Sequence, residues 1–369
     1  MIKVSTDLVR SAARNPQYVV ADTRSSNEYI GWKSSQSKAG GHIVGSTDFS
    51  ADWMNDRYSS KRDHILHMMR FKGITPDKKV ILCDFDISRA EKVERFLRGE
   101  GIEDISFYDL SCWTGSLKSF PEYWRFVPVE WVKEVIDGGR PEHFEGTDYR
   151  ILEVSWGGPK PEFLQAHIPG SFHVDTEEYE QGPEWIRPSF EELERFVCKY
   201  GITPDTAVIV YCLPGQIGAN HKLTVMLEFI GVKHVYLLNG NMDTWLDAGY
   251  DYESGLTLPD FDNTSFGLPI PQHPELIVDM QEVKDIMHEG RDDQVIDMRT
   301  WEAYIGEDTE YDYVPLAGRI PGTMWVHDKY HYFNPDDTIG NVDEVVKHWF
   351  DNGINIGKRM AFFCGSGAW

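Results

Sequence analysis

One pattern occurs three times along the chain and strongly limits how the chain can fold. In each copy a glycine precedes a short turn and an apolar run that ends at a cysteine, in residues 73–83, 201–212 and 353–364. Each apolar run is short and rich in β-branched or aromatic residues, which is typical of a buried parallel strand. A chain that repeats one supersecondary unit folds as serial copies of that unit. The sequence therefore predicts three similar domains in tandem.

A second motif precedes each copy of the first. An Asp-x-Arg triplet closes an upstream apolar run at Asp22–Arg24 and again at Asp297–Arg299, and a Gly-x-Ile-x-Gly segment follows each triplet. The middle copy has diverged, since Ser155 replaces the arginine and residues 166–170 begin with alanine. Amphipathic helices separate these strands. Alternating strands and helices predict α/β domains, each a mostly parallel sheet flanked by helices.

The repeats place the domain boundaries. We predict domains over residues 1–127, 128–254 and 275–369, with a linker rich in proline, glycine and polar residues between the last two. The first two repeats continue past their cysteines with another helix and strand, whereas the third stops at Trp369. We therefore expect the third domain to be C-terminally incomplete in this chain and the native chain to continue.

The charge balance restricts the partners of this chain. Its 369 residues include 36 Lys and Arg against 60 Asp and Glu, a net charge of −24, so it repels nucleic acid and anionic membranes. No apolar run approaches the ~20 residues that cross a bilayer, and the N-terminus lacks a secretory signal. We expect a cytoplasmic protein, or a periplasmic one if a signal peptide has been removed. A site for a small anion would need positive charge of its own.

The cysteines indicate thiol chemistry rather than a metal site. There are five, and no two form a Cys-x-x-Cys pair, so neither zinc nor another metal is expected. A disulfide framework is equally unexpected in a chain of this length. One or two of the thiols are therefore candidates for reactive groups, and no organic cofactor is required.

Spacing distinguishes the cysteines of the three repeats. The distance from the repeat glycine is eleven positions to Cys212 and to Cys364, but only ten to Cys83. Asp84 then occupies the nucleophile position of the first repeat, and Cys83 points to the other face of its strand. A carboxylate cannot replace a thiol as the nucleophile. We therefore predict that the first domain is inactive and that Cys83 is a buried structural thiol.

The second repeat keeps the register but not its surroundings. Pro214 lies in the loop after Cys212 and removes one backbone donor, and Ser155 stands in place of the arginine. Cys212 is therefore a secondary candidate, in a domain that we expect to be inactive or secondary.

The third repeat keeps every part of the pattern, which makes Cys364 the candidate nucleophile. The loop Gly365, Ser366, Gly367 and Ala368 can turn its backbone N–H groups toward the sulfur as an anion-binding nest. Such a nest favours the thiolate, which is the reactive form. Arg299 is intact and can bind the charged end of an anionic substrate. The alternative is that Cys364 is a buried structural thiol.

Together these motifs resemble the rhodanese superfamily of thiosulfate and mercaptopyruvate sulfurtransferases. Three tandem copies are similar to the three-domain bacterial members, in which the last domain carries the activity. The resemblance implies transfer of a sulfane sulfur from thiosulfate or a similar donor, through a Cys364 persulfide, to cyanide or a thiol acceptor. A sulfur-acceptor protein is a further candidate partner. Mercaptopyruvate stays open as donor, although Ile305 stands where its users carry a second arginine.

Two other functions stay open from the sequence. A non-catalytic rhodanese scaffold or sulfur carrier fits the two diverged repeats, but not the intact Cys364 and Arg299. A cysteine-based phosphatase or arsenate reductase needs an arginine six positions after the cysteine. Gly218 holds that position after Cys212, and the chain ends before it is reached after Cys364.

Overall fold

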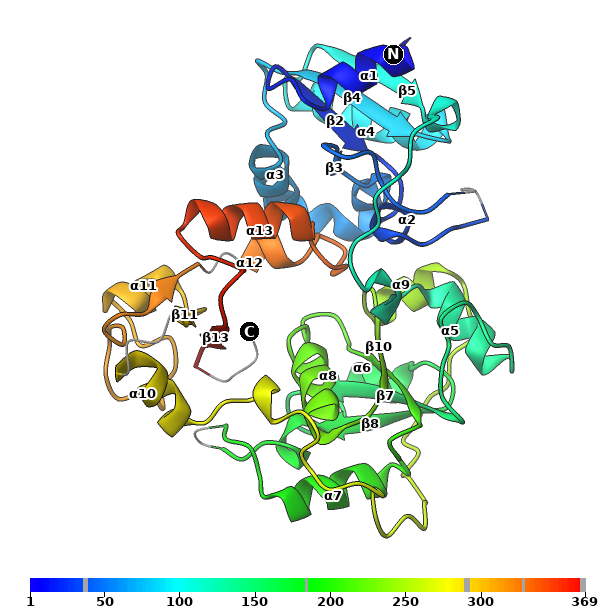
Figure 1. Cartoon of the computed structure of the whole chain (residues 1–369). Coiled ribbons are helices and arrows are strands. Elements are labelled where there is room, and N and C mark those ends of the chain that lie inside the picture. Colours follow the sequence, from blue (N-terminus) through cyan, green and yellow to red (C-terminus); the bar gives the residue numbers. More distant parts are fainter. Residues whose placement is uncertain (36–38, 183–184, 289–292, 327–328, 366–369) are drawn as a thin grey trace. The chain divides into compact units, whose positions relative to one another are not determined.

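The computed structural model describes residues 1–35, 39–182, 185–288, 293–326 and 329–365 of the chain (Figure 1). The chain divides into two compact units. The first contains Met1–Trp124 and Lys329–Val345, and the second contains Arg125–Asp328 and Val346–Trp369. No helix in these described ranges is both long and apolar enough to cross a membrane.

The first repeat is a five-stranded parallel sheet with strand order β1-β5-β4-β2-β3. Its strands are β1 Ile2–Lys3, β2 Tyr18–Asp22, β3 Thr47–Asp48, β4 Lys79–Asp84 and β5 Ile105–Asp109. Its helices are α1 Thr6–Ala12, α2 Ser26–Ile30, η1 Ala51–Met54, η2 Asp56–Lys61, α3 Arg62–Phe71, α4 Ile87–Gly99 and η3 Leu110–Cys112. Along β4 the side chains alternate between two cores, with Val80 and Leu82 in one and Ile81 and Cys83 in the other. A continuous apolar run is what a strand covered on both faces requires.

The second repeat has the same strand order, β6-β10-β9-β7-β8, and all its strands are parallel. Its strands are β6 Phe126–Val127, β7 Tyr149–Ser155, β8 Ser171–Asp175, β9 Ala207–Tyr211 and β10 His234–Leu238. Its helices are η4 Tyr123–Arg125, which leads into β6, then α5 Val129–Ile136, α6 Pro161–Gln165, η5 Thr176–Glu178, α7 Phe190–Lys199, α8 Ala219–Ile230 and α9 Met242–Asp247. Ser189 and Glu192 form a reciprocal capping box at the start of α7, which satisfies backbone N–H groups that the helix leaves free.

The third repeat contributes a smaller parallel sheet with strand order β12-β11-β13. These strands are β11 Gln294–Asp297, β12 Met324–Trp325 and β13 Met360–Phe363. The helices are η6 Pro274–Leu276, α10 Met280–His288, α11 Trp301–Ile305, α12 Lys329–Tyr332 and α13 Val342–Asp351. The order matches β3-β2-β4 and β8-β7-β9 of the earlier repeats. The predicted fold class, α/β repeats with mostly parallel sheets flanked by helices, is therefore confirmed.

The segment Lys329–Val345 of the third repeat packs on the first repeat, where Figure 1 shows α12 beside α3. The ring of His331 stacks on Phe71 with a centroid distance of 3.6 Å. The buried ammonium of Lys72 donates to Asp48 at 2.6 Å and to Glu344 at 2.8 Å. Buried ions persist when they are paired in this way. No sequence pattern predicts this packing, because it joins segments that are far apart in the chain.

Candidate active site

Strand pairing places the three candidate positions in the same register. The residues at the end of each central strand pair are Asp22 with Cys83, Glu153 with Tyr211, and Asp297 with Phe363. The residue that follows Cys83, Tyr211 or Phe363 in the sequence is Asp84, Cys212 or Cys364, respectively. These three residues are therefore structurally equivalent, as their spacing predicted. Cys83 lies one position earlier, is buried in the core, and has a thiol pKa that burial raises well above its usual value.

In the first repeat, the position equivalent to Cys364 is occupied by Asp84, which lies in a buried ionic network. Asp84 is fully buried and accepts hydrogen bonds from Arg89 Nη2 and from Thr23 Oγ1, each at 2.7 Å. Arg89 also donates to Glu28 at 2.8 Å. Burial raises the pKa of Asp84 although Arg89 opposes the shift. No thiol stands at this position, and the prediction that the first domain is inactive depends on that fact.

In the second repeat the thiol is present but inaccessible. Cys212 is fully buried after β9. Without the arginine of the other repeats, buried Glu153 accepts hydrogen bonds from Ser155 and, at 2.6 Å, from Nδ1 of His173 on the neighbouring strand β8. A histidine therefore takes the role that arginine has elsewhere. The burial of Cys212 favours a structural role, and its catalytic role stays a secondary prediction.

In the third repeat Cys364 follows β13 and is partly exposed to solvent. Nearby, Arg299 holds Asp297 through Nε at 3.0 Å and Nη2 at 2.7 Å, and Nη2 also donates to the carbonyl of Gly318 at 2.8 Å. The hydrogen bonds that Arg299 donates to Asp297 raise the pKa of Arg299, and the charge of a Cys364 thiolate adds to that shift. Arg299 therefore lies within electrostatic reach of the sulfur, and its role as a substrate ligand stays a prediction.

The residue after the cysteine fits tightly between two tyrosines. Tyr313 donates its hydroxyl to the carbonyl of Gly365 at 3.1 Å. A Cβ atom at Gly365 would overlap the ring of Tyr311, so only glycine fits this contact. The remaining predicted loop residues Ser366, Gly367 and Ala368 lie outside the described residues. The predicted anion-binding nest therefore stays a prediction beyond Gly365.

A lysine of the second repeat is the site residue that the sequence analysis missed. Lys222 on α8 is 11 % exposed and forms an ion pair with Glu180, which is 1 % exposed. Burial lowers the pKa of Lys222 to about 8, while the negative charge of Cys364 acts in the opposite direction. Lys222 therefore interacts with Cys364 although 142 positions separate them in the sequence. It supplies a cation of the kind that an acidic chain needs in order to bind an anion.

The described residues contain no group of three or more His, Cys, Asp and Glu side chains arranged to hold a metal ion.

Comparison with known proteins places the chain among sulfur-transferring enzymes. The family described as Rhodanese-like domain matches residues 5–112 and 129–248. Thiosulfate sulfurtransferase YnjE of Escherichia coli (strain K12) is 30% identical over 353 residues, which cover 94% of this chain and 79% of that protein. The thiosulfate sulfurtransferase of Bos taurus is 26% identical over 257 residues, covering 66% of this chain and 82% of that protein.

Solved structures resemble the whole chain. The anaerobic ergothioneine biosynthesis enzyme from Chlorobium limicola, in complex with its natural substrate trimethyl histidine, has a TM-score of 0.88 and 28% identity. The match covers 100% of this chain and 91% of that one. A structure of EanB with ergothioneine covalently linked to a cysteine persulfide has the same TM-score of 0.88 and the same coverage.

Proposed function

The chain belongs to the rhodanese-like family, and from this premise we propose that it moves a sulfane sulfur from thiosulfate, through a persulfide on Cys364, to cyanide or a thiol. The chain is a sulfurtransferase of the rhodanese type. One observation carries the finer proposal. Of the three equivalent strand-end positions, the first holds a carboxylate, the second a fully buried thiol, and the third a partly exposed thiol.

The reaction follows ping-pong covalent catalysis. The Cys364 thiolate attacks the outer sulfur of thiosulfate, the S–S bond of the donor breaks, and sulfite leaves with the bonding electron pair. The enzyme then carries a Cys364 persulfide. Cyanide or a thiolate attacks the outer sulfur, the enzyme S–S bond breaks, and the Cys364 thiolate is restored. The electrons balance without a cofactor. An S–S bond breaks in each step, and it is replaced by an S–S bond in the first step and by a C–S bond (with cyanide) or an S–S bond (with a thiol) in the second.

Local charge supports an anionic donor. The chain as a whole repels thiosulfate because its net charge is −24. Arg299 and Lys222 come from different repeats, and both interact with the charge of Cys364. Each is oriented by a carboxylate, Asp297 or Glu180. Oriented ion pairs of this kind can stabilise charge without reorganising during the reaction.

The identity of the sulfur donor is tested by the rate at which thiocyanate forms. The reduced wild-type chain is supplied with cyanide and with either thiosulfate or 3-mercaptopyruvate. We expect faster thiocyanate formation with thiosulfate, because Ile305 lacks the charge that would hold the carboxylate of mercaptopyruvate. Turnover with mercaptopyruvate alone would reassign the donor. No turnover with either compound would contradict the enzyme proposal and favour the scaffold or sulfur-carrier function.

A second candidate acceptor is trimethyl histidine, the substrate bound by the Chlorobium enzyme. Aromatic rings gather beside Gly365, with a centroid distance of 5.3 Å between Tyr311 and Tyr313 and of 6.5 Å between Tyr313 and Trp185. Aromatic faces are suited to quaternary ammonium groups. The persulfide-loaded chain is mixed with trimethyl histidine, and ergothioneine is sought by mass spectrometry. If no ergothioneine forms while cyanide is still converted to thiocyanate, the acceptor is cyanide or a thiol and not trimethyl histidine.

Loss of the Lys222 charge should produce a falling limb in the pH profile of sulfur loading. Lys222 is cationic below its pKa of about 8, so the rate of sulfite release should fall as pH rises through that value. In Lys222→Met we expect a rate lower by roughly ten-fold at neutral pH, which corresponds to one weakened charge interaction, and no falling limb. The measurement is the single-turnover rate of sulfite release between about pH 6 and about pH 10.

The control for this experiment is Lys233→Met, which removes an exposed lysine of the same repeat that pairs with Asp205. Its profile should match the wild type. A falling limb that persists unchanged in Lys222→Met would show that another group titrates, and would remove Lys222 from the site.

A further inference from the structure

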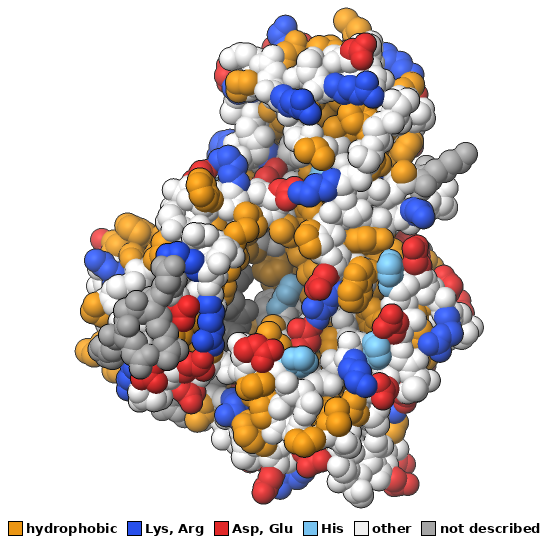
Figure 2. Space-filling model, in the orientation of Figure 1, with side chains coloured by type: hydrophobic (Ala, Val, Ile, Leu, Met, Phe, Trp, Pro, Cys, Tyr) orange, Lys and Arg blue, Asp and Glu red, His pale blue; other side chains and the backbone are white. Residues whose placement is uncertain are grey.

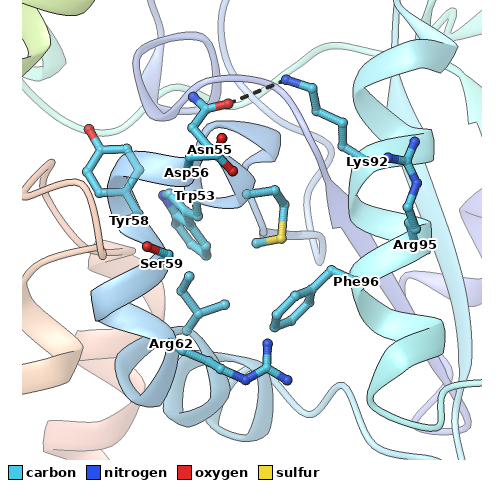
Figure 3. A pocket seen from close by; sticks show the side chains of 11 residues that line it. Trp53, Asn55, Asp56, Tyr58, Ser59, Arg62, Lys92, Arg95 and Phe96 are labelled. Carbon is cyan, nitrogen blue, oxygen red and sulfur yellow. Dashed lines mark hydrogen bonds between the residues drawn. The ribbon is translucent and has the colours of Figure 1, made fainter.

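The first repeat contains a pocket of about 460 Å³ that the sulfur-transfer reaction does not use (Figure 3). It is formed by η1, η2, the start of α3, and α4, so every lining residue belongs to one repeat of the first unit. Its volume lies in the range of about 300–1,000 Å³ that is usual for small-molecule sites.

The floor of the pocket is apolar and aromatic. Trp53 is 1 % exposed and Ile65 is 4 % exposed, and the half-buried ring of Phe96 lies across the pocket from Trp53 (Figure 3). The buried indole N–H of Trp53 has no hydrogen-bond acceptor among the described residues. A floor of this kind favours a ligand with a flat apolar body, because contact removes apolar area from water.

The rim of the pocket is cationic. Arg62, Lys92 and Arg95 line it, against a single carboxylate, Asp56. Arg62 is engaged, since it lies 5.5 Å over the ring of Phe96 and pairs with Glu100. Among the described residues, Lys92 donates one long hydrogen bond, to the amide oxygen of Asn55 at 3.4 Å (Figure 3). Arg95 makes no ion pair or hydrogen bond within the described part of the chain, so its guanidinium is available to an anion.

The first repeat does not share the acidity of the chain. Residues 1–124 carry 18 Lys and Arg against 17 Asp and Glu, whereas the whole chain carries 36 against 60. Basic side chains are prominent on the face of the first repeat that Figure 2 shows. Residues 1–124 are therefore close to neutral in charge, unlike the chain as a whole.

We propose that this pocket binds a small aromatic organic anion. The ring of the ligand packs against Phe96 over the floor of Trp53 and Ile65, and its sulfonate, phosphate or carboxylate lies between Lys92 and Arg95. An uncharged ring would gain nothing from the rim, and a bare inorganic anion would leave the apolar floor in water. The proposal does not depend on the reaction at Cys364.

Binding is tested by isothermal titration calorimetry of the full chain with three matched probes. These are 2-naphthalenesulfonate, the uncharged 2-naphthalenesulfonamide, and methanesulfonate, which has the anion without the ring. We expect the naphthalenesulfonate to bind at one site at least about ten-fold more tightly than either of the others. In the double variant Lys92→Gln/Arg95→Gln its affinity should fall by about ten-fold or more. In Cys364→Ser it should be unchanged.

The matched control is Arg70→Gln, which removes an exposed cation at the end of α3 that does not line the pocket. Its affinity for the naphthalenesulfonate should equal that of the wild type. The proposal is overturned if Arg70→Gln weakens binding as much as the double variant does. It is also overturned if the double variant binds normally, or if methanesulfonate binds as tightly as the naphthalenesulfonate.

Discussion

Replacing Cys364 with serine should abolish sulfur loading, with a loss of at least about a thousand-fold in rate, as expected when the nucleophile of a covalent mechanism is removed. A serine hydroxyl stays protonated at neutral pH and cannot hold a persulfide. Cys364 follows β13 and is partly exposed, so its replacement should leave the packing of the sheet intact. Circular dichroism of the variant should match the wild type.

The measurement is intact-protein mass spectrometry after incubation of the reduced chain with thiosulfate. Wild type should gain one sulfur atom, and Cys364→Ser should gain none. Cys212→Ser is the matched control, because Cys212 holds the equivalent position of the second repeat but is fully buried. It should load sulfur as the wild type does. Loading that disappears in Cys212→Ser and persists in Cys364→Ser would reverse the assignment.

Replacing Lys72 with methionine should destabilise the first unit by about 3–5 kcal/mol, the usual consequence of leaving buried charges unpaired. The Lys72 side chain is fully buried between Asp48 and Glu344. Burial opposes its charge, yet the two carboxylates outweigh burial and raise the pKa of the ammonium. Asn341 also donates to Asp48 at 3.0 Å, and Thr47 donates to Glu344. Methionine fills the space but satisfies none of these groups.

The destabilisation is measured by urea unfolding, and hydrogen exchange of residues 329–345 reports whether that segment is released. Lys347→Met is the control, since Lys347 lies on α13, the helix that carries Glu344, and forms an exposed pair with Asp351. Exposed pairs of this kind contribute about 0.3–0.5 kcal/mol. The double variant Lys72→Met/Glu344→Gln should recover part of the stability by removing one unpaired charge. A Lys72→Met cost no larger than that of Lys347→Met would contradict this account.

The local features of the fold could be predicted from the sequence because their signals are local. Each apolar run marked a central strand. Cys83 lies ten positions after its repeat glycine and Cys364 lies eleven, so Cys364 corresponds to Asp84 and not to Cys83, since side chains alternate along a strand. The strand pairing of Asp22 with Cys83 and of Asp297 with Phe363 confirms that register. Asp22 and Arg24 are only two positions apart in the chain, and they form an ion pair with a distance of 2.6 Å between Arg24 Nη2 and Asp22 Oδ2.

The contacts between distant segments were decided only by the tertiary structure. Neither the approach of Lys222 to Cys364 nor the burial of Lys72 against Glu344 has a periodic or spacing signal, because each joins residues that are far apart in the chain. A lysine in a helix is exposed by default, and only packing against another segment removes it from water and shifts its pKa. The sequence by itself determined the repeats, the strand register and the candidate nucleophile. The tertiary structure decided which charges surround that nucleophile and which segment covers the first repeat, because charge pairing depends on distance in space and not along the chain.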